Sequence, residues 1–221
     1  MVTAEQTGAA LLQPRFTLKD VTIEKKERLF KKHFALDEYV VHYKKFDGSE
    51  TPSLVREVFE RDQDAVAILP YDAARDEVVL IEQFRPGALK DPVSPWLIEI
   101  VAGLIDAGES ELEAAVRELN EEAHFKITPD KLHLITSVYP SPGGISERVT
   151  VYVANVDATH IDALGGLAVE NEDIRIFKVK AQEAFEACRN GRICNCAALV
   201  ALLNLQLHHE EWRAQFMAQP A

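Results

Sequence analysis

The sequence contains little cysteine, methionine or tryptophan, with three, two and two residues respectively among 221. The cysteines, Cys188, Cys194 and Cys196, are odd in number, and their Cys-x-Cys spacing is typical neither of a disulfide framework nor of a usual zinc site. We therefore expect reduced thiols in a cytoplasmic protein.

Long apolar runs are also missing. No stretch of roughly 18 uncharged apolar residues occurs, which is about the least that a membrane-spanning helix needs. Residues 1–16 lack the basic-then-apolar order of a secretory signal. We expect neither a membrane span nor secretion.

Positive charge is scarce, because the sequence has 24 Lys and Arg but 36 Asp and Glu, which gives a formal net charge of −12. Affinity for nucleic acid rests mainly on cations that face phosphates, so this balance argues against a nucleic-acid-binding protein. Small anionic substrates stay possible, since a metal ion can bring them to an acidic site. Hydrophobic residues, at 47%, are as frequent as in globular proteins, and the length suits one ordinary domain with a smaller appendage.

The N-terminal region carries the pattern of short β-strands. We expect strands at residues 21–23, 34–43 and 54–59, with a turn at Asp47-Gly48. Three strands of this size make a poor isolated domain and need a partner surface. Residues 1–61 are therefore expected to form a small antiparallel β domain, and residues 62–221 the main domain.

The main domain mixes strands and helices without strict alternation, which predicts an α/β or α+β fold, or an α/β/α sandwich. The expected strands lie at residues 65–69, 78–81, 96–101, 133–138, 149–156 and 174–179, and the expected helices at 110–123, 181–191 and 197–212.

The clearest of these helices begins after Ser110. Ser110 and Glu113 form the sequence pattern of a capping box. The apolar residues are three or four positions apart and predict one stripe that faces a core. That stripe consists of Leu112, Val116, Leu119 and Ala123.

The same helix concentrates carboxylates. Glu118 and Glu122 lie about one turn apart on one face, with Glu121 beside them. Like charges at this spacing cost a few tenths of a kcal/mol, and Arg117 can offset part of that through Glu121. The remaining negative field suits hard divalent cations, which take oxygen ligands. The alternative is a solvated acidic face, as in most Glu-rich helices.

The preceding loop favours the metal hypothesis. The segment Gly103-x5-Glu109 can bend so that backbone carbonyls and Glu109 approach the acidic face. The whole spacing resembles the Nudix box, Gly-x5-Glu-x7-Arg-Glu-hydrophobic-x-Glu-Glu-x-Gly-hydrophobic. His124 replaces the second glycine of the box at the helix end, where a left-handed conformation is common. The matching positions are Gly103, Glu109, Arg117, Glu118, Leu119, Glu121, Glu122 and Phe125.

Four further segments resemble the ADP-ribose pyrophosphatase family of bacteria, and the similarity covers roughly residues 30–209. The resemblance implies a Nudix α/β/α sandwich whose N-terminal β domain is exchanged within a homodimer. It also implies hydrolysis of a nucleotide sugar, ADP-ribose, to AMP and ribose 5-phosphate. The four segments are residues 56–61, 81–85, 139–148 and 170–175.

The resemblance also implies roles for individual residues. Glu118, Glu122, Glu172 and the Ala102 carbonyl would hold two or three Mg²⁺ ions, with Mn²⁺ as the other candidate. Glu170 would be the general base, on a flexible segment that follows Gly165-Gly166, and Glu121 and Arg117 would complete the catalytic set. His33 stands where related enzymes carry Phe. The implied substrate contacts are His33, Phe34, Arg56, Glu57, Arg61, Arg85, Leu104, Ser141 and Glu147.

Several alternatives stay open. Arg61 and Arg85 could fork onto phosphate oxygens or form surface ion pairs. A hydrolase of GDP-mannose would share the fold, the dimer and the box, although residues 146–148 and 170–173 favour ADP-ribose. A Nudix-like domain that only senses the nucleotide would typically lack box carboxylates, and a DNA-binding regulator would carry an added basic helical module; neither feature occurs here.

Overall fold

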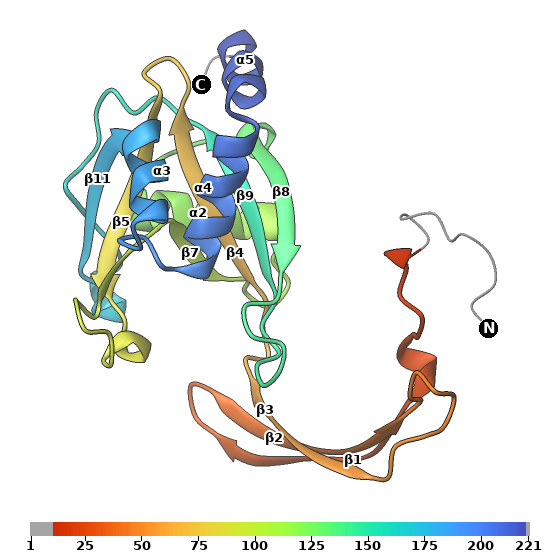
Figure 1. Ribbon diagram of the computed structural model, residues 1–221. Coiled ribbons are helices and arrows are strands. Elements are labelled where there is room, and N and C mark those ends of the chain that lie inside the picture. The colour runs from red at the N-terminus through yellow and green to blue at the C-terminus, as the bar shows by residue number, and fades with distance from the viewer. Residues whose placement is uncertain (1–10, 220–221) are drawn as a thin grey trace. The chain divides into compact units, whose positions relative to one another are not determined.

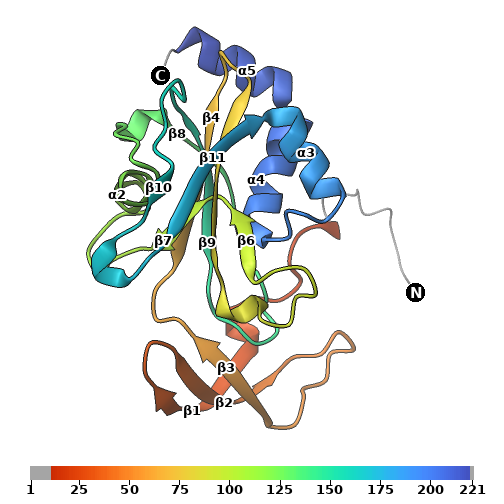
Figure 2. The same cartoon turned by 90° about the vertical axis from the view of Figure 1, so that its left-hand side faces the viewer.

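The computed structural model describes residues 11–219 and divides them into two compact units. Unit 1 contains the described residues up to Asp62 together with Gly143–Ser146, and unit 2 contains the rest. Figures 1 and 2 show the elements of each unit. None of the described helices is long and apolar enough to cross a membrane.

Unit 1 is built on an antiparallel sheet in the order β1-β2-β3, preceded by a 3₁₀ turn at Leu18–Asp20. The strands are β1 (Val21–Lys31), β2 (Ala35–Tyr43) and β3 (Leu54–Glu60). The expected strand at 21–23 is too short, because β1 continues through a run of charged residues. All its residues are exposed, so charged side chains reach water while the backbone pairs with β2.

This sheet encloses almost no core. Among residues 11–62, only Ala35 and Asp37 are buried, while Ile23 and Val55 keep 53% and 57% of their surface exposed. Arg28 binds both oxygens of Asp37, at 2.7 and 3.1 Å. A buried carboxylate with exposed cationic partners thus takes the place of an apolar interior.

Unit 2 is an α/β/α sandwich, as expected, around a mixed sheet in the order β10-β11-β5-β4-β9-β8. Strands β4 and β9 pair in parallel, and their other neighbours pair antiparallel. The strands are β4 (Ala65–Asp72), β5 (Glu77–Phe84), β6 (Trp96–Glu99), β7 (Val101–Leu104), β8 (Leu132–Val138), β9 (Val149–Asn155), β10 (Leu164–Gly165) and β11 (Ile174–Lys180).

Helices cover both faces of this sheet. In Figure 2, α2 (Glu111–Ala123) lies to the left of the sheet, and α3 (Ala181–Arg189) and α4 (Cys196–Leu207) lie to the right. Val66 of β4 packs in the cluster that contains Leu119 of α2, and Leu69 packs in the cluster of the opposite helices. Because both faces are covered, β4 is buried at every residue, as its uninterrupted apolar run suggests.

Two of the expected elements are each divided into two in the structure. The strand expected at 96–101 is two strands, because β6 pairs with β5 whereas β7 pairs with β4. The helix expected at 197–212 is also two, since α4 ends at Leu207 and α5 (His209–Ala218) follows a non-helical His208. His209 bonds to Asp76 at 2.7 Å and to the Tyr71 hydroxyl at 3.3 Å. These contacts hold α5 against the β4–β5 hairpin.

Candidate active site

Two of the acidic residues of α2 face the protein interior. The capping box is confirmed, because the Ser110 hydroxyl accepts the Glu113 N–H at 3.3 Å and Glu113 accepts the Ser110 N–H at 2.8 Å. The apolar stripe was wrong at Leu112, which is exposed. Glu118 and Glu122 are instead on the inner face, with 9% and 3% of their surface exposed. The solvated acidic face is therefore wrong for these two residues.

Strand β7 supplies the other wall of the cluster. The Glu122 carboxylate accepts a hydrogen bond from the Ala102 N–H at 3.0 Å. A Cβ added to Gly103 would lie 1.9 Å from Oε1 of Glu118. The first glycine of the box is thus required by the close approach of Glu118 to the strand, rather than by a bend of the loop at that point.

Arg117 joins the helix to the loop before it. Its Nε and Nη2 donate to the two oxygens of Glu109, at 3.0 and 2.9 Å, and Nη2 also donates to the Leu104 carbonyl at 2.8 Å. Its Nη1 donates to Glu118 at 2.6 Å and to Glu121 at 3.1 Å. The hydrogen bond with Glu109, followed by those with Glu118, raises the pKa of Arg117. One guanidinium therefore fixes three carboxylates and the loop.

The electrostatics of the cluster are unfavourable without a further cation. Burial raises the pKa of Glu118, although Arg117 partly opposes this, and burial raises the pKa of Glu122 well above its ordinary value. The charge of Glu172 adds to both shifts. A carboxylate that is buried without a matching charge is costly, and a divalent ion would reduce that cost.

The donor set fits such an ion. Among residues 11–219, no group of three or more His, Cys, Asp or Glu side chains is already arranged to hold a metal. Mg²⁺ does not require one, because it usually keeps several waters and binds one or two protein carboxylates. Glu122, bonded to the backbone of Ala102, and Glu118, packed against Gly103, match that preference.

The segment after β10 lies against the C-terminal end of α2. The Gly166 N–H donates to the Glu121 carbonyl at 3.1 Å, and a Cβ on Gly165 would lie 2.1 Å from the Glu122 carbonyl oxygen. These glycines therefore permit close packing on α2, and the expected flexibility of the segment stays a prediction. Their positions bring residues 166–172 beside the acidic helix.

Glu170 and Glu172 take different positions on this segment. Glu170 ends a 3₁₀ turn, Ala168–Glu170, and is exposed. Glu172 is half-buried, accepts the Leu167 N–H at 3.1 Å, and acts electrostatically on Glu118 and Glu122. Two acids one residue apart thus have distinct surroundings.

His124 adopts the left-handed conformation expected at the second glycine of the box, with φ 58° and ψ 20°. Its N–H donates to the Asn120 carbonyl at 3.2 Å, which closes the helix, and its ring contacts the Leu164 carbonyl at 3.2 Å. His124 thus takes the place of the glycine by capping the C-terminus of α2 in the left-handed conformation.

Three of the expected substrate residues of unit 1 belong to an aromatic group around Phe34. The rings of His33 and Phe34 lie 4.6 Å apart, and the Arg61 guanidinium lies 4.7 Å from the Phe34 ring. Phe59 packs on Phe34 at 4.7 Å and was missed by sequence reasoning. Only the pairing of Phe59 with Leu36 places it there, and that register is not readable from local pattern.

Arg56 and Glu57 are consecutive residues of β3, paired with Tyr39 and Glu38 respectively. Successive side chains of a strand point to opposite faces, so these two do not share a face of the sheet. In unit 2, Ser141 is exposed and Glu147 is half-buried on the connection between β8 and β9.

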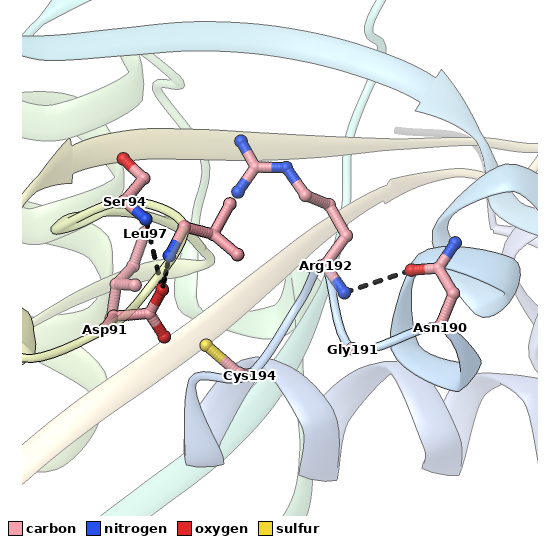
Figure 3. Close-up of a pocket in the computed structure, with 8 residues that line it drawn as sticks. Asp91, Ser94, Leu97, Asn190, Gly191, Arg192 and Cys194 are labelled. Carbon is pink, nitrogen blue, oxygen red and sulfur yellow. Dashed lines mark hydrogen bonds between the residues drawn. The ribbon is translucent and has the colours of Figure 1, made fainter.

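Figure 3 shows a hollow of about 200 Å³ between the segment that precedes β6 and the α3–α4 connection. Arg192 and Cys194 line it on one side, and Asp91 and Ser94 on the other. None of the expected site residues lines this hollow. The acidic cluster on α2 therefore remains the candidate active site.

Comparison with known proteins shows the family of this chain. The NUDIX domain model matches residues 61–192. The ADP-ribose pyrophosphatase of Escherichia coli strain K12 is 44% identical over 201 residues, which covers 89% of this chain and 95% of that protein. The ADP-ribose pyrophosphatase of Haemophilus influenzae is 35% identical, with 89% and 90% covered.

More distant proteins share the fold. The GDP-mannose pyrophosphatase of Pectobacterium atrosepticum is 33% identical over 174 residues, with 78% of this chain and 87% of that protein covered. The crystal structure of an ADP compounds hydrolase superposes with a TM-score of 0.66 at 22% identity, covering 90% of this chain and 99% of that one. The matched domain contains α2, the loop before it and the segment packed against it, so the buried glutamates lie within a NUDIX domain, and this chain is a member of the Nudix family.

Proposed function

We propose that this protein hydrolyses the pyrophosphate of ADP-ribose to AMP and ribose 5-phosphate with the help of a divalent metal. The observation that carries the proposal is the burial of Glu118 and Glu122 against β7, where Gly103 makes room for a carboxylate. The substrate is supported by the relatives, because the ADP-ribose pyrophosphatases are 44% and 35% identical and the GDP-mannose pyrophosphatase 33%.

Glu118, Glu122, Glu172 and the carbonyl of Ala102 are the residues that would hold Mg²⁺, or Mn²⁺, with two or three ions per site. Such ions neutralise phosphate charge and make a bound water more acidic. Arg117 keeps Glu118 in place through the 2.6 Å bond from Nη1 and ties the same guanidinium to Glu109. Each residue thus contributes to binding or orientation before any bond is broken.

Glu170 is the proposed general base. Among the described residues its side chain makes no hydrogen bond or ion pair, and the segment that carries it is packed on α2 through Gly165 and Gly166. An exposed carboxylate beside the acidic helix can accept a proton from the attacking water when substrate is in place. Glu121, held by Arg117 at 3.1 Å, is one alternative base.

The proposed substrate contacts are His33, Phe34, Arg56, Glu57, Arg61, Arg85, Leu104, Ser141 and Glu147. The aromatic group around Phe34 suits a nucleobase, because rings of this kind stack on bases. The Leu104 carbonyl accepts a hydrogen bond from Arg117 Nη2 at 2.8 Å, which ties Leu104 to α2.

A homodimer with exchanged N-terminal domains, residues 1–61, completes the proposal, with residues 62–221 as the catalytic domain. It is supported by the sheet of unit 1, whose apolar residues Ile23, Phe30 and Val55 are about half exposed. A three-stranded sheet without a core is marginal unless another surface covers it. The three unpaired thiols suit a cytoplasmic protein.

The decisive experiment is a panel of nucleotide sugars that includes ADP-ribose and GDP-mannose, assayed with Mg²⁺ and with EDTA, with products separated. We expect the highest kcat/KM for ADP-ribose and no turnover in EDTA. A higher kcat/KM for GDP-mannose than for ADP-ribose would show that GDP-mannose is the preferred substrate. Binding of ADP-ribose without cleavage under any metal would favour a sensor.

A further inference from the structure

Glu99, at the end of β6, carries a buried carboxylate that the expected site does not include. Only 2% of its surface is exposed. Its oxygens accept hydrogen bonds from Arg85 Nη2 at 2.7 Å, from Gln83 at 3.3 Å and from Asn195 at 3.0 Å. Two side chains from the end of β5 and one from the start of α4 therefore fix one carboxylate.

Both the oxygen and the nitrogen of the Asn195 side-chain amide are hydrogen-bonded. Its Oδ1 accepts the Ala198 N–H at 3.0 Å and so caps the N-terminus of α4, while its Nδ2 donates to Oε1 of Glu99. The helix cap orients the amide, and the amide orients the carboxylate. Glu99 thus receives a fixed donor from an element that lies outside the Nudix box.

Arg85 meets Glu99 side-on. Nε lies 3.0 Å and Nη2 2.7 Å from Oε2 of Glu99. Within the described part of the chain, Nη1 makes no hydrogen bond to protein, and 41% of the side chain is exposed. Its outer N–H groups therefore remain available to an anion.

Arg85 also lies near the acidic cluster. Burial lowers its pKa, but Glu99, and then the charges of Glu122 and Glu172, raise it above its ordinary value. The guanidinium thus belongs to the same electrostatic environment as the proposed metal ligands.

We propose that Asn195 and Glu99 are positioning residues that hold the Arg85 guanidinium in one orientation, with Nη1 directed to a phosphate oxygen of the substrate. This inference rests on the proposed function and adds two residues to its site. An arginine has many rotamers, and one that is fixed before binding loses less freedom when the anion arrives. The helix cap of α4 therefore contributes to substrate affinity.

The test separates the cap from the contact with Glu99. Asn195→Ser keeps a good capping side chain but is too short to reach Glu99, whereas Asn195→Ala loses both. We expect Asn195→Ser to lower kcat/KM for ADP-ribose about tenfold, mainly through KM, with a melting temperature close to that of the wild type. Asn195→Ala should show the same kinetic loss and, in addition, a lower melting temperature.

The second arm uses Arg85→Lys, which leaves a cation beside buried Glu99 but offers no second nitrogen to present to a phosphate. If Asn195 acts through Arg85, Asn195→Ser has no further effect on kcat/KM in this background. Equal losses in both backgrounds would show a merely structural role, and an unchanged Asn195→Ser enzyme would also overturn the inference. A wild type that cleaves no nucleotide sugar would instead refute the proposed function, and the inference with it.

Discussion

At the scale of single residues, the candidate site depends on carboxylates that are buried, where burial disfavours their charged form. Glu122 is almost fully buried and has only the Ala102 N–H as a hydrogen-bond donor among the described residues. Because burial raises its folded-state pKa above the unfolded value, its charge destabilises the metal-free fold at neutral pH, and that penalty decreases as pH falls. Metal binding would remove the same penalty.

Glu122→Gln should therefore separate activity from stability. The amide keeps the size of the side chain and removes its charge, so kcat should fall by orders of magnitude at saturating Mg²⁺ while the melting temperature stays equal or rises. Enzyme assays and thermal unfolding in EDTA measure both quantities. A wild type that stays active in EDTA would contradict the metal assignment.

Gly103→Ala should displace Glu118. The new Cβ would fall 1.9 Å from the carboxylate oxygen, so the side chain must move and its bond to Arg117 is lost. We expect a loss of about 1–3 kcal/mol in stability together with most of the activity. Gly87→Ala is the matched control, because a Cβ there meets nothing within 4 Å. Equal behaviour of the two variants would show that the close approach is unimportant.

At the scale of elements, the segment between β10 and β11 is held against α2 by two glycines and one backbone hydrogen bond. That packing places Glu170 and Glu172 on the same short segment but in different surroundings, one exposed and one half-buried. Their expected roles can therefore be separated by substitution.

Glu170→Gln should lower kcat at saturating metal with little change in KM, because a base is lost while binding persists. Glu172→Gln should instead raise the metal concentration needed for half-maximal activity. Metal titrations of both variants at saturating ADP-ribose distinguish the two. Near-normal kcat for Glu170→Gln would assign the base elsewhere, with Glu121 and Glu147 next to be tested.

Helix α5 packs on β8 through His133. Its ring lies 5.0 Å from the Phe216 ring and 6.0 Å from that of Trp212, and Gln215 lies 3.1 Å from its Nδ1. Burial lowers the pKa of His133 below its usual 6.5, an effect that Asp130 opposes and Lys131 reinforces more weakly. The unfolded chain therefore takes up a proton here at a higher pH than the folded protein does.

Stability should consequently fall as pH decreases through 6.5, and the His133 contribution should be fully present above that value. His133→Phe should make the urea midpoint less sensitive to pH between about 7.5 and 5.5. The exposed His160 provides the control, since His160→Gln should leave the wild-type dependence unchanged. An unchanged slope in His133→Phe would refute the assignment.

At the scale of the whole molecule, the two units differ in how they are stabilised. Unit 2 has apolar clusters on both faces of its sheet, whereas unit 1 buries only Ala35 and Asp37 among residues 11–62. A three-stranded sheet with as little core as that of unit 1 depends on a partner surface. A second copy of the chain is the proposed partner.

The protein should therefore sediment as a dimer, and deletion of residues 1–61 should abolish activity rather than only reduce stability. The deletion removes the aromatic group around Phe34, whereas the cores of unit 2 stay intact. Sedimentation velocity and assays at the same concentration test both statements. A monomer that is fully active at nanomolar concentration would contradict the exchanged dimer.

The features that sequence alone determined are local ones. The capping box at Ser110, the left-handed His124 and the one-turn spacing of Glu118 and Glu122 follow from helical geometry, which links residues a few positions apart. Most strands were placed correctly for the same reason, because alternation and apolar runs are properties of short segments.

Contacts between distant segments were decided only by the tertiary structure. Nothing in the sequence around Gly103 predicts that the Glu118 carboxylate will occupy the space beside its Cα. Likewise, nothing in the sequence around Arg85 predicts that Glu99 and Asn195 will orient its guanidinium. The end of α4 at Leu207 likewise lacks a local signal, since the contacts of His209 come from the β4–β5 hairpin. Spacing along the chain thus determined which residues share a helix face, whereas the packing of strands and helices determined which of them meet.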